Sequence, residues 1–277
     1  MSLFMLPTHK NILYLLLLFN IIACNNGAPI QQQEQAENAI TAPIPLQYEI
    51  INILPHDTSA YTQGLEWYKG LLFESTGNYG KSKLQTLDAN MQLVGKKIKL
   101  NNEIFGEGIT LFNDKIYQLT WKEHKVFVYN SNTLQKEKEF YWQYEGWGIT
   151  HNDTALFVST GGSNIYMIDP IQFAIKKTIG VYNHYGYVSD INELEYVDGK
   201  IFANIYGQNE IVVIDPNSGQ ITNTINFNNL LAQAGVKYEP TDIDPGYVLN
   251  GIAYQPTSKT FFITGKCWPV MVEIKIK

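Results

Sequence analysis

A short motif recurs five times along the chain, and this repeat limits the possible folds more than any other feature. Each copy begins with a polar or aromatic residue, continues in four cases with glycine, and leads into a β-rich run. Repeats of about 40 residues or more, each with four short strands, are typical of β-propellers. In a propeller, residues at the same position of each repeat come together around the axis. The first residues of the five copies therefore predict a shared site. They are Gln63, Glu107, Trp147, Asn192 and Asn250.

The repeat predicts an all-β fold, a five-bladed β-propeller. Within a unit, turns such as Asp198-Gly199 separate short strands with buried or half-buried patterns. The last unit supplies only three strands, whereas the apolar segment 46–54 lies ahead of the first unit without a partner. We expect this N-terminal segment to complete the last blade as its outer strand, which closes the ring and covers an exposed edge. A stacked β-solenoid is the competing fold, but it needs no such strand.

The N-terminal residues have the composition of a targeting segment. His9 and Lys10 precede an apolar run that ends at Cys24, as in a secretory signal, and the run is too short to span a membrane comfortably. Because Cys24 occupies the position of the lipidated cysteine in a bacterial lipobox, we expect an exported lipoprotein that is anchored to the membrane through this lipid and faces the periplasm. An ordinary cleaved signal with an incidental cysteine is the alternative.

These features divide the chain into three parts. Residues 1–23 are the expected signal peptide, and residues 24–45, rich in Asn, Gln, Ala and Pro, are the expected lipoprotein tether. Residues 46–277 form the expected propeller, which would be the catalytic domain. A single large β domain accounts for this length.

Charge and composition exclude several kinds of partner and chemistry. The net charge is −6, and all 20 basic residues are lysine, which argues against a nucleic-acid partner and excludes bidentate arginine clamps. Cys267 has no disulfide partner once Cys24 is lipidated. The histidines lack metal-ligand spacing, so we predict no metal site. No glycine cluster opens a helix as in a phosphate-binding loop, and no nucleophile elbow is present.

A second set of residues follows the first at a nearly constant distance. Fourteen residues after the first position come Gly77, Trp121, Gly161 and Tyr206, and sixteen residues after Asn250 comes Lys266. An antiparallel hairpin of this length places both positions on the same rim. We therefore expect Trp121, Tyr206 and Lys266 to join the first set at the channel mouth. Tyr61 and Phe105, each two residues ahead of the first position, would add further aromatic rings.

Glu107 is the candidate for proton transfer in this ring. Burial among aromatic side chains disfavours a charged carboxylate and raises its pKa toward neutrality, where a general acid–base works best. Lys266 would oppose this shift. The residues alone leave three functions open: acid–base catalysis, a metal-dependent hydrolase of the lactonase kind with Ca²⁺ on oxygen ligands, and a non-catalytic propeller that binds peptides.

Several motifs resemble those of the plant- and bacterial-type glutaminyl-peptide cyclotransferases. They include "YTQGLEW", "FGEGIT", "GWGIT", "NELEYVDGKIFANIY" and "FFITGKCWPVMVEI", and the resemblance covers residues 46–277. It implies a five-bladed propeller that converts the N-terminal glutamine of peptides or proteins into pyroglutamate and releases ammonia. It also implies that catalysis requires no cofactor, although the channel of such a propeller leaves room for a structural divalent cation.

The resemblance also implies roles for individual residues. Glu107 would be the general acid–base, and the substrate would be bound by residues of the other motifs, namely Tyr61, Gln63, Phe105, Trp121, Trp147, Asn192, Tyr206 and Lys266. Asn250 and Trp268 are further members to test. Three positions depart from the family pattern: Tyr61 stands where phenylalanine is more frequent, Tyr206 where tryptophan is common, and Gln85 where arginine often occurs.

Overall fold

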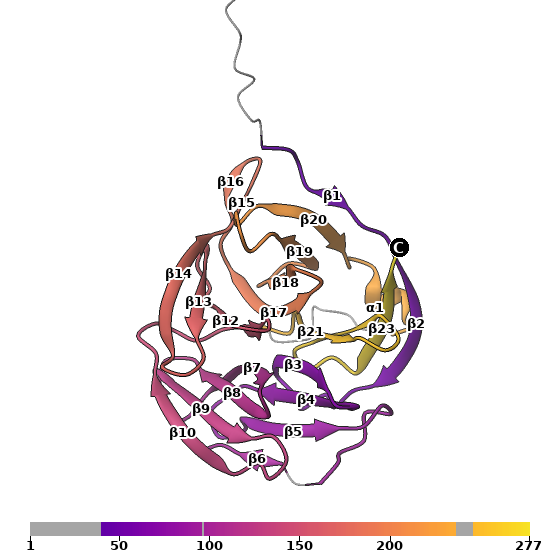
Figure 1. Ribbon diagram of the computed structural model, residues 1–277. Helices are drawn as coiled ribbons and strands as arrows, with labels where there is room; N and C mark the ends of the chain where they lie inside the picture. The colour runs from indigo at the N-terminus through magenta and orange to yellow at the C-terminus, as the bar shows by residue number, and fades with distance from the viewer. Residues whose placement is uncertain (1–39, 96, 237–245) are drawn as a thin grey trace, which may run out of the picture. The chain divides into compact units, whose positions relative to one another are not determined.

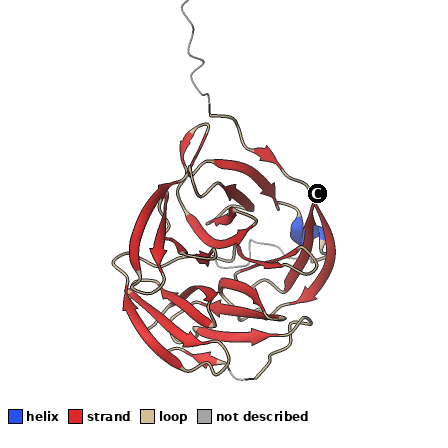
Figure 2. Cartoon of the chain, viewed as in Figure 1, coloured by secondary structure: helices blue, strands red, loops and turns tan. Residues whose placement is uncertain are grey.

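The computed structural model describes residues 40–95, 97–236 and 246–277, and these form a ring of five β-sheets around a central axis (Figure 1). Apart from one short helix, α1 (Leu230–Gln233), the regular structure of this part of the chain is all strand (Figure 2). The predicted five-bladed propeller is confirmed. The expected signal peptide, Cys24 and most of the expected tether lie outside the described residues. Among the described residues, no helix is long and apolar enough to cross a membrane.

Each blade contains four antiparallel strands, which are listed here from the axis outward. Blade one contains β3 (Thr62–Tyr68), β4 (Leu71–Thr76), β5 (Lys83–Leu87) and β6 (Ile98–Lys99). Blade two contains β7 (Gly106–Phe112), β8 (Lys115–Thr120), β9 (Lys125–Asn130) and β10 (Lys136–Tyr141). Blade three contains β11 (Ile149–His151), β12 (Leu156–Ser159), β13 (Asn164–Asp169) and β14 (Ala174–Gly180). Blade four contains β17 (Ile191–Val197), β18 (Lys200–Ile205), β19 (Glu210–Ile214) and β20 (Ile221–Asn226).

Blade five is completed by a strand from the other end of the sequence. Its inner strands are β21 (Leu249–Gln255), β22 (Thr260–Gly265) and β23 (Val270–Ile276), and its outer strand is β2 (Tyr48–Pro55). Antiparallel pairing of β2 with β23 confirms the predicted closing strand. β1 (Ile44–Pro45) pairs in parallel with β20, so these two residues of the expected tether belong to blade four. A small hairpin, β15 (Tyr182–Asn183) and β16 (Gly186–Tyr187), connects blades three and four.

The core lies between neighbouring blades, because each blade presents apolar faces to both neighbours. Leu65 and Leu72 of blade one, for example, pack with Met271 of blade five. The outermost strands are largely exposed, as the charged sequence of β10 shows. Burial therefore increases toward the axis, where the first strands of the blades meet.

Glycine follows the first repeat position because neighbouring backbones approach closely there. A Cβ atom added to Gly148 would lie 2.1 Å from the carbonyl oxygen of Asn192, and one on Gly64 would lie 2.5 Å from the Ile109 nitrogen. Blade four is the exception, since it carries Glu193 at this position. The Glu193 carboxyl accepts hydrogen bonds from the backbone N–H of Leu65 (3.3 Å) and of Ile252 (2.9 Å). One side chain thus joins three blades at the axis.

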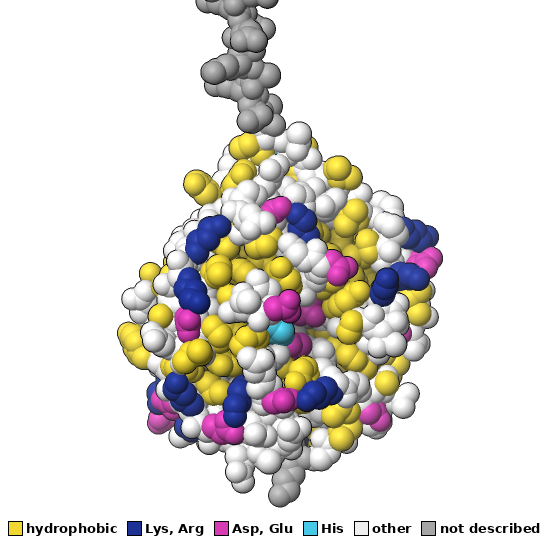
Figure 3. All heavy atoms as spheres, viewed as in Figure 1, with side chains coloured by type: hydrophobic (Ala, Val, Ile, Leu, Met, Phe, Trp, Pro, Cys, Tyr) yellow, Lys and Arg dark blue, Asp and Glu magenta, His cyan; other side chains and the backbone are white. Residues whose placement is uncertain are grey.

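Further along the first strands, the channel contains more acidic groups. Glu66 accepts a hydrogen bond from the Leu111 N–H (2.9 Å) and lies 3.3 Å from His151 Nε2. Glu195 accepts one from the Tyr254 N–H (2.8 Å). Burial, reinforced by the negative charge of Glu66, raises the pKa of Glu195 well above its usual value. On the face in Figure 3, acidic and histidine side chains gather near the middle of the ring.

Candidate active site

Irregularities in the first strands place the first repeat position in the channel. The pairing of the first two strands shifts register at Gln63, and it does so again around Glu107, Asn192 and Asn250. Such β-bulges re-aim side chains that a regular strand would direct along its sheet. The glycine after the repeat position is the sequence signal for this geometry.

A recurring backbone hydrogen bond brings the second repeat position to the same rim. In four blades, the N–H of the later residue donates to the carbonyl two residues ahead of the first position. The pairs are Gly77 with Tyr61 (2.8 Å), Trp121 with Phe105 (3.1 Å), Tyr206 with Asp190 (2.8 Å) and Lys266 with Val248 (2.9 Å). The fourteen-residue spacing thus corresponds to one hairpin closed at the channel mouth.

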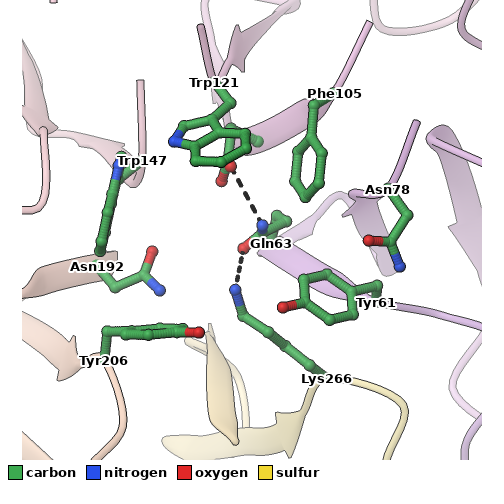
Figure 4. A pocket seen from close by; sticks show the side chains of 10 residues that line it. Tyr61, Gln63, Asn78, Phe105, Trp121, Trp147, Asn192, Tyr206 and Lys266 are labelled. Carbon is green, nitrogen blue, oxygen red and sulfur yellow. Dashed lines mark hydrogen bonds between the residues drawn. The ribbon is translucent and has the colours of Figure 1, made fainter. Parts of the chain in front are cut away.

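These elements enclose a pocket of about 260 Å³. This volume is just below the range of roughly 300–1,000 Å³ typical of pockets for drug-sized ligands, so it suits a ligand the size of one amino-acid residue. Figure 4 shows side chains from the different blades pointing into it. The lining residues are Tyr61, Gln63, Asn78, Phe105, Glu107, Trp121, Trp147, Asn192, Tyr206 and Lys266. The structure thus brings together Glu107 and the eight residues expected to bind substrate.

A chain of hydrogen bonds runs across the centre of the pocket (Figure 4). The Lys266 ammonium donates to Gln63 Oε1 at 2.7 Å, and Gln63 Nε2 donates to Glu107 Oε1 at 3.2 Å. Gln63 therefore separates a cation from a carboxyl and is oriented by both. Among the residues that the structure describes, the second oxygen of Glu107 has no hydrogen-bond partner, so it can interact with a bound molecule.

Burial changes the acid–base properties of both ends of this chain. Burial raises the pKa of Glu107 well above its usual value; Lys266 opposes the shift, and the negative charges of Glu123 and Glu145 reinforce it. Burial also lowers the pKa of Lys266 to about 8, although Glu107 attracts its positive charge. Burial therefore shifts the pKa of Glu107 upward and the pKa of Lys266 downward, both toward neutral pH, where general acid–base groups work best.

Asn192 presents an unsatisfied hydrogen-bonding group. Its side chain is buried, and Oδ1 has no partner in the described structure. Its backbone is held in place, because the Ser159 hydroxyl donates to the Asn192 carbonyl at 2.6 Å. A buried acceptor without a partner is costly unless a ligand or water supplies the donor. Asn192 therefore marks a position where a bound amine or amide N–H would be held.

Aromatic rings form the walls of the pocket. Phe105 lies 5.4 Å from Trp121 and 6.2 Å from Tyr61, and Trp147 lies 5.8 Å from Tyr206, measured between ring centroids. The Lys266 ammonium lies over the rings of Tyr61 (4.6 Å) and Tyr206 (5.2 Å). The attraction between the ammonium and these ring faces holds Lys266 in the centre of the site.

Two expected members of the site lie behind the pocket. Asn250 is fully buried, and its Nδ2 donates to the Thr62 carbonyl (3.0 Å) and to Gln63 Oε1 (3.3 Å), so it supports Gln63 without lining the cavity. Trp268 is absent from the lining of the cavity. Its buried ring packs on Gly265 and belongs to the core between blades four and five, and the preceding Cys267 has a left-handed backbone conformation with φ 58°.

The sequence reasoning missed three residues at this site. Asn78 lines the cavity from a turn in which its φ is 80°, a conformation that asparagine tolerates well. Glu123 accepts hydrogen bonds from the Tyr79 hydroxyl (2.9 Å) and from the Phe105 N–H (3.4 Å). Glu145 lies two residues ahead of Trp147, the same offset at which Tyr61 precedes Gln63 and Phe105 precedes Glu107.

The described residues do not suggest a metal centre at the pocket. They contain no group of three or more His, Cys, Asp or Glu side chains arranged to hold a metal ion. The pocket itself offers one carboxyl with a raised pKa beside a lysine, a donor set that suits neither Ca²⁺ nor Zn²⁺. Cys267 is buried.

Fold and site together define a propeller protein with an axial acid–base pocket of the size of one residue. The glutamine cyclotransferase family matches residues 20–276, and the chain belongs to this family. It is 37% identical over 235 residues to a glutaminyl-peptide cyclotransferase of Arabidopsis thaliana. The alignment covers 83% of this chain and 72% of the relative. The crystal structure of Myxococcus xanthus glutaminyl cyclase superposes with a TM-score of 0.78 at 34% identity, over 85% of this chain and 98% of that one.

Proposed function

We propose that the protein is a glutaminyl-peptide cyclotransferase, an acyltransferase that converts the N-terminal glutamine of peptides or proteins into pyroglutamate and releases ammonia. The observation that carries this proposal is the buried Glu107, joined through Gln63 to Lys266 in a pocket with aromatic walls. A pocket of this size admits one N-terminal residue, and membership of the family supports the reaction.

In the proposed reaction the substrate attacks itself. The neutral α-amine forms a bond to the Cδ carbon of its own side chain, and the bond from Cδ to the amide nitrogen breaks. Glu107 takes a proton from the attacking nitrogen and delivers it to the departing one, so ammonia leaves and the carboxyl returns to its starting state. A carboxyl whose pKa is raised by burial suits both halves of this transfer.

The other polar groups assist by orientation and charge. The Lys266 ammonium and the Gln63 amide lie where they can stabilise the negative charge that develops on the side-chain oxygen. The free Oδ1 of Asn192 can accept a hydrogen bond from the α-amine or the leaving amide. The aromatic walls, including Tyr61, Trp121 and Trp147, hold the glutamine in a folded conformation and exclude water. Because the reaction is intramolecular, these contributions suffice.

Replacement of the carboxyl tests this assignment. Glu107→Gln keeps the size of the side chain and an oxygen for the Gln63 amide but removes the group that takes up and releases the proton. We expect kcat for ammonia release from Gln-Gln to fall by about 10²–10⁴-fold, with little change in thermal stability. Glu137→Gln, an exposed change on β10, is the matched control. A fully active Glu107→Gln protein would exclude Glu107 as the proton carrier, and tight peptide binding by the wild type without ammonia release would indicate a non-catalytic propeller.

We further propose that catalysis requires no cofactor. The single carboxyl and the lysine at the centre of the pocket support this proposal. Ammonia release should therefore persist after dialysis against a chelator. Loss of activity that Ca²⁺ restores would favour a metal-dependent hydrolase instead. The same treated sample tests for a structural divalent cation, because its removal would lower the midpoint of thermal unfolding.

We propose that the protein is exported and anchored to a bacterial membrane through lipidated Cys24, with its globular part in the periplasm. Nucleic acid is not among the proposed partners. The short apolar run that ends at Cys24 supports this proposal. We expect the wild type to partition into detergent and Cys24→Ala to remain in the aqueous phase. Equal partitioning of the two proteins would contradict lipidation at Cys24.

A further inference from the structure

One carboxylate oxygen accepts hydrogen bonds from two walls of the pocket. Glu145 Oε2 lies 2.8 Å from Trp121 Nε1 and 3.1 Å from Trp147 Nε1. Trp121 follows the second strand of blade two, Trp147 precedes the first strand of blade three, and Glu145 lies on the segment that connects these blades. Figure 4 shows the nitrogens of the two indoles turned toward each other.

This shared acceptor constrains the width of the pocket. An indole has one hydrogen-bond donor, and a bond to a charged acceptor is shorter and stronger than one between neutral groups. When both indoles bond to the same oxygen, the rotation of each ring depends on that of the other. The Trp147 ring also packs closely on Gly161, where an added Cβ atom would lie 2.6 Å from the ring. Trp147 is thus held by a carboxylate at its nitrogen and by close packing on a glycine, and Trp121 is held by the same carboxylate.

We propose that Glu145 is a positioning residue, which sets the separation of Trp121 and Trp147 and so the fit of the substrate glutamine side chain between them. This inference rests on the proposed function. The neighbouring carboxylate of Glu123 bonds to the Tyr79 hydroxyl and the Phe105 N–H, and to neither indole. Glu145 therefore differs from Glu123 in geometry, although both place negative charge near Glu107.

Three substitutions separate geometry from charge. Glu145→Gln keeps the length and a carbonyl oxygen, so we expect KM for Gln-naphthylamide to stay within about threefold of the wild type. Glu145→Asp keeps the charge but is too short to reach both indoles, and Glu145→Ala removes the acceptor. For these two we expect KM to rise about tenfold, the size expected for loss of a hydrogen bond to a charged group, with a smaller change in kcat. Glu137→Gln is the control for loss of a remote charge.

A spectroscopic measurement tests the same inference without catalysis. Freed indoles should be quenched more strongly by acrylamide, so tryptophan fluorescence should show more quenching in Glu145→Asp and Glu145→Ala than in Glu145→Gln and the wild type. Unchanged quenching, or a rise in KM for Glu145→Gln but not for Glu145→Asp, would overturn the proposal. A wild type that releases no ammonia would overturn the proposed function, whereas the quenching comparison would still decide whether Glu145 holds the indoles.

Discussion

At the scale of single residues, the pocket depends on two glycines whose missing side chains make room for aromatic rings. A Cβ atom on Gly77 would lie 2.3 Å from the Phe105 ring, and one on Gly161 would lie 2.6 Å from the Trp147 ring. In the sequence both glycines occupy the second repeat position, where the other units have tryptophan, tyrosine or lysine. They are therefore as much a part of the pocket as the rings themselves.

Substitution of Gly161 should change binding through Trp147. Gly161→Ala forces an alanine into φ +76° and displaces the ring, so we expect KM for a glutaminyl peptide to rise at least tenfold. Gly199→Ala is the matched control, because Gly199 has φ +81° but nothing within 4 Å of the added Cβ atom. Both variants should lose about 1–2 kcal/mol of unfolding free energy from the backbone conformation. An equal rise in KM for both would refute the role assigned to the Gly161 contact.

Most of the pocket could be predicted at this scale because repetition converts sequence positions into places in space. The first and second repeat positions identified Gln63, Glu107, Asn192 and Lys266 as neighbours. Hydrogen-bond partners could not be predicted in the same way, since they depend on rotamers and on contacts between blades. Glu145, for instance, has the right offset from Trp147, but its bond to Trp121 requires the neighbouring blade to be in place. Trp268 shows the converse, because it lies two residues after Lys266 of the pocket but packs in the core.

At the scale of secondary-structure elements, the first strand of each blade is constrained on the side that faces the axis. Its N–H groups there have no strand to pair with, and neighbouring blades supply the acceptors. Glu193 on β17 does so for Leu65 and Ile252, and the hydroxyl of Thr150 on β11 accepts a hydrogen bond from the Tyr196 N–H at 2.9 Å. These N–H groups find their acceptors only when the first strands of the five blades are assembled. The sequence of a single blade therefore does not reveal the acceptors.

Removal of the Glu193 side chain should expose this dependence. Glu193→Ala leaves the N–H groups of Leu65 and Ile252 without their acceptor in a buried region, and an unsatisfied buried group costs about 1–3 kcal/mol. We expect the free energy of unfolding in urea to fall by roughly 2–4 kcal/mol. Glu210→Ala, at the half-buried start of β19 in the same blade, should change it much less. Similar losses for the two variants would show that the axial hydrogen bonds contribute little.

At the scale of the whole molecule, a buried ion pair lies where the ring closes. His56 directly follows the closing strand β2, and its Nε2 lies 2.9 Å from Glu74 Oε1 on β4 of blade one. Its Nδ1 lies 2.8 Å from the Trp268 carbonyl, which can only accept, so both ring nitrogens face acceptors and the charged imidazolium satisfies them. Gln85, where the family often has arginine, donates to Glu74 at 2.8 Å. A neutral donor there leaves the positive charge beside Glu74 to His56.

The two members of this pair predict a window of pH for its contribution. Burial lowers the pKa of His56, but the charge and hydrogen bond of Glu74 outweigh burial and raise it above 6.5. Burial likewise raises the pKa of Glu74, but His56 and the hydrogen bonds lower it below 4.5 overall. The His56 contribution is complete below pH 6.5 and is lost as the pH rises through its folded pKa. The Glu74 contribution is complete above pH 4.5 and is lost as the pH falls through its folded pKa.

Removal of one partner should therefore cost most at mildly acidic pH. We expect His56→Gln to lower the free energy of unfolding by about 3–5 kcal/mol near pH 5–6, and by less at pH 9 or pH 3. Glu49→Gln breaks an exposed pair with Lys277 (3.5 Å) on the same closing strand and should cost about 1 kcal/mol or less. Chemical unfolding of the three proteins across this pH range measures the difference. A difference that does not change with pH would mean that the His56–Glu74 pair is not ionised in the folded protein.

The closing strand also has a consequence for folding during synthesis on the ribosome. Ribosomes make β2 before every other strand of blade five, yet its partner β23 follows all the strands of blades one to four in the sequence. β2 therefore stays without its partner β23 until about 220 later residues have been made. Four blades can form during this wait, but the fifth cannot be completed until β23 has been made. Nascent chains should therefore remain sensitive to proteolysis at β2 long after blades one to four resist it.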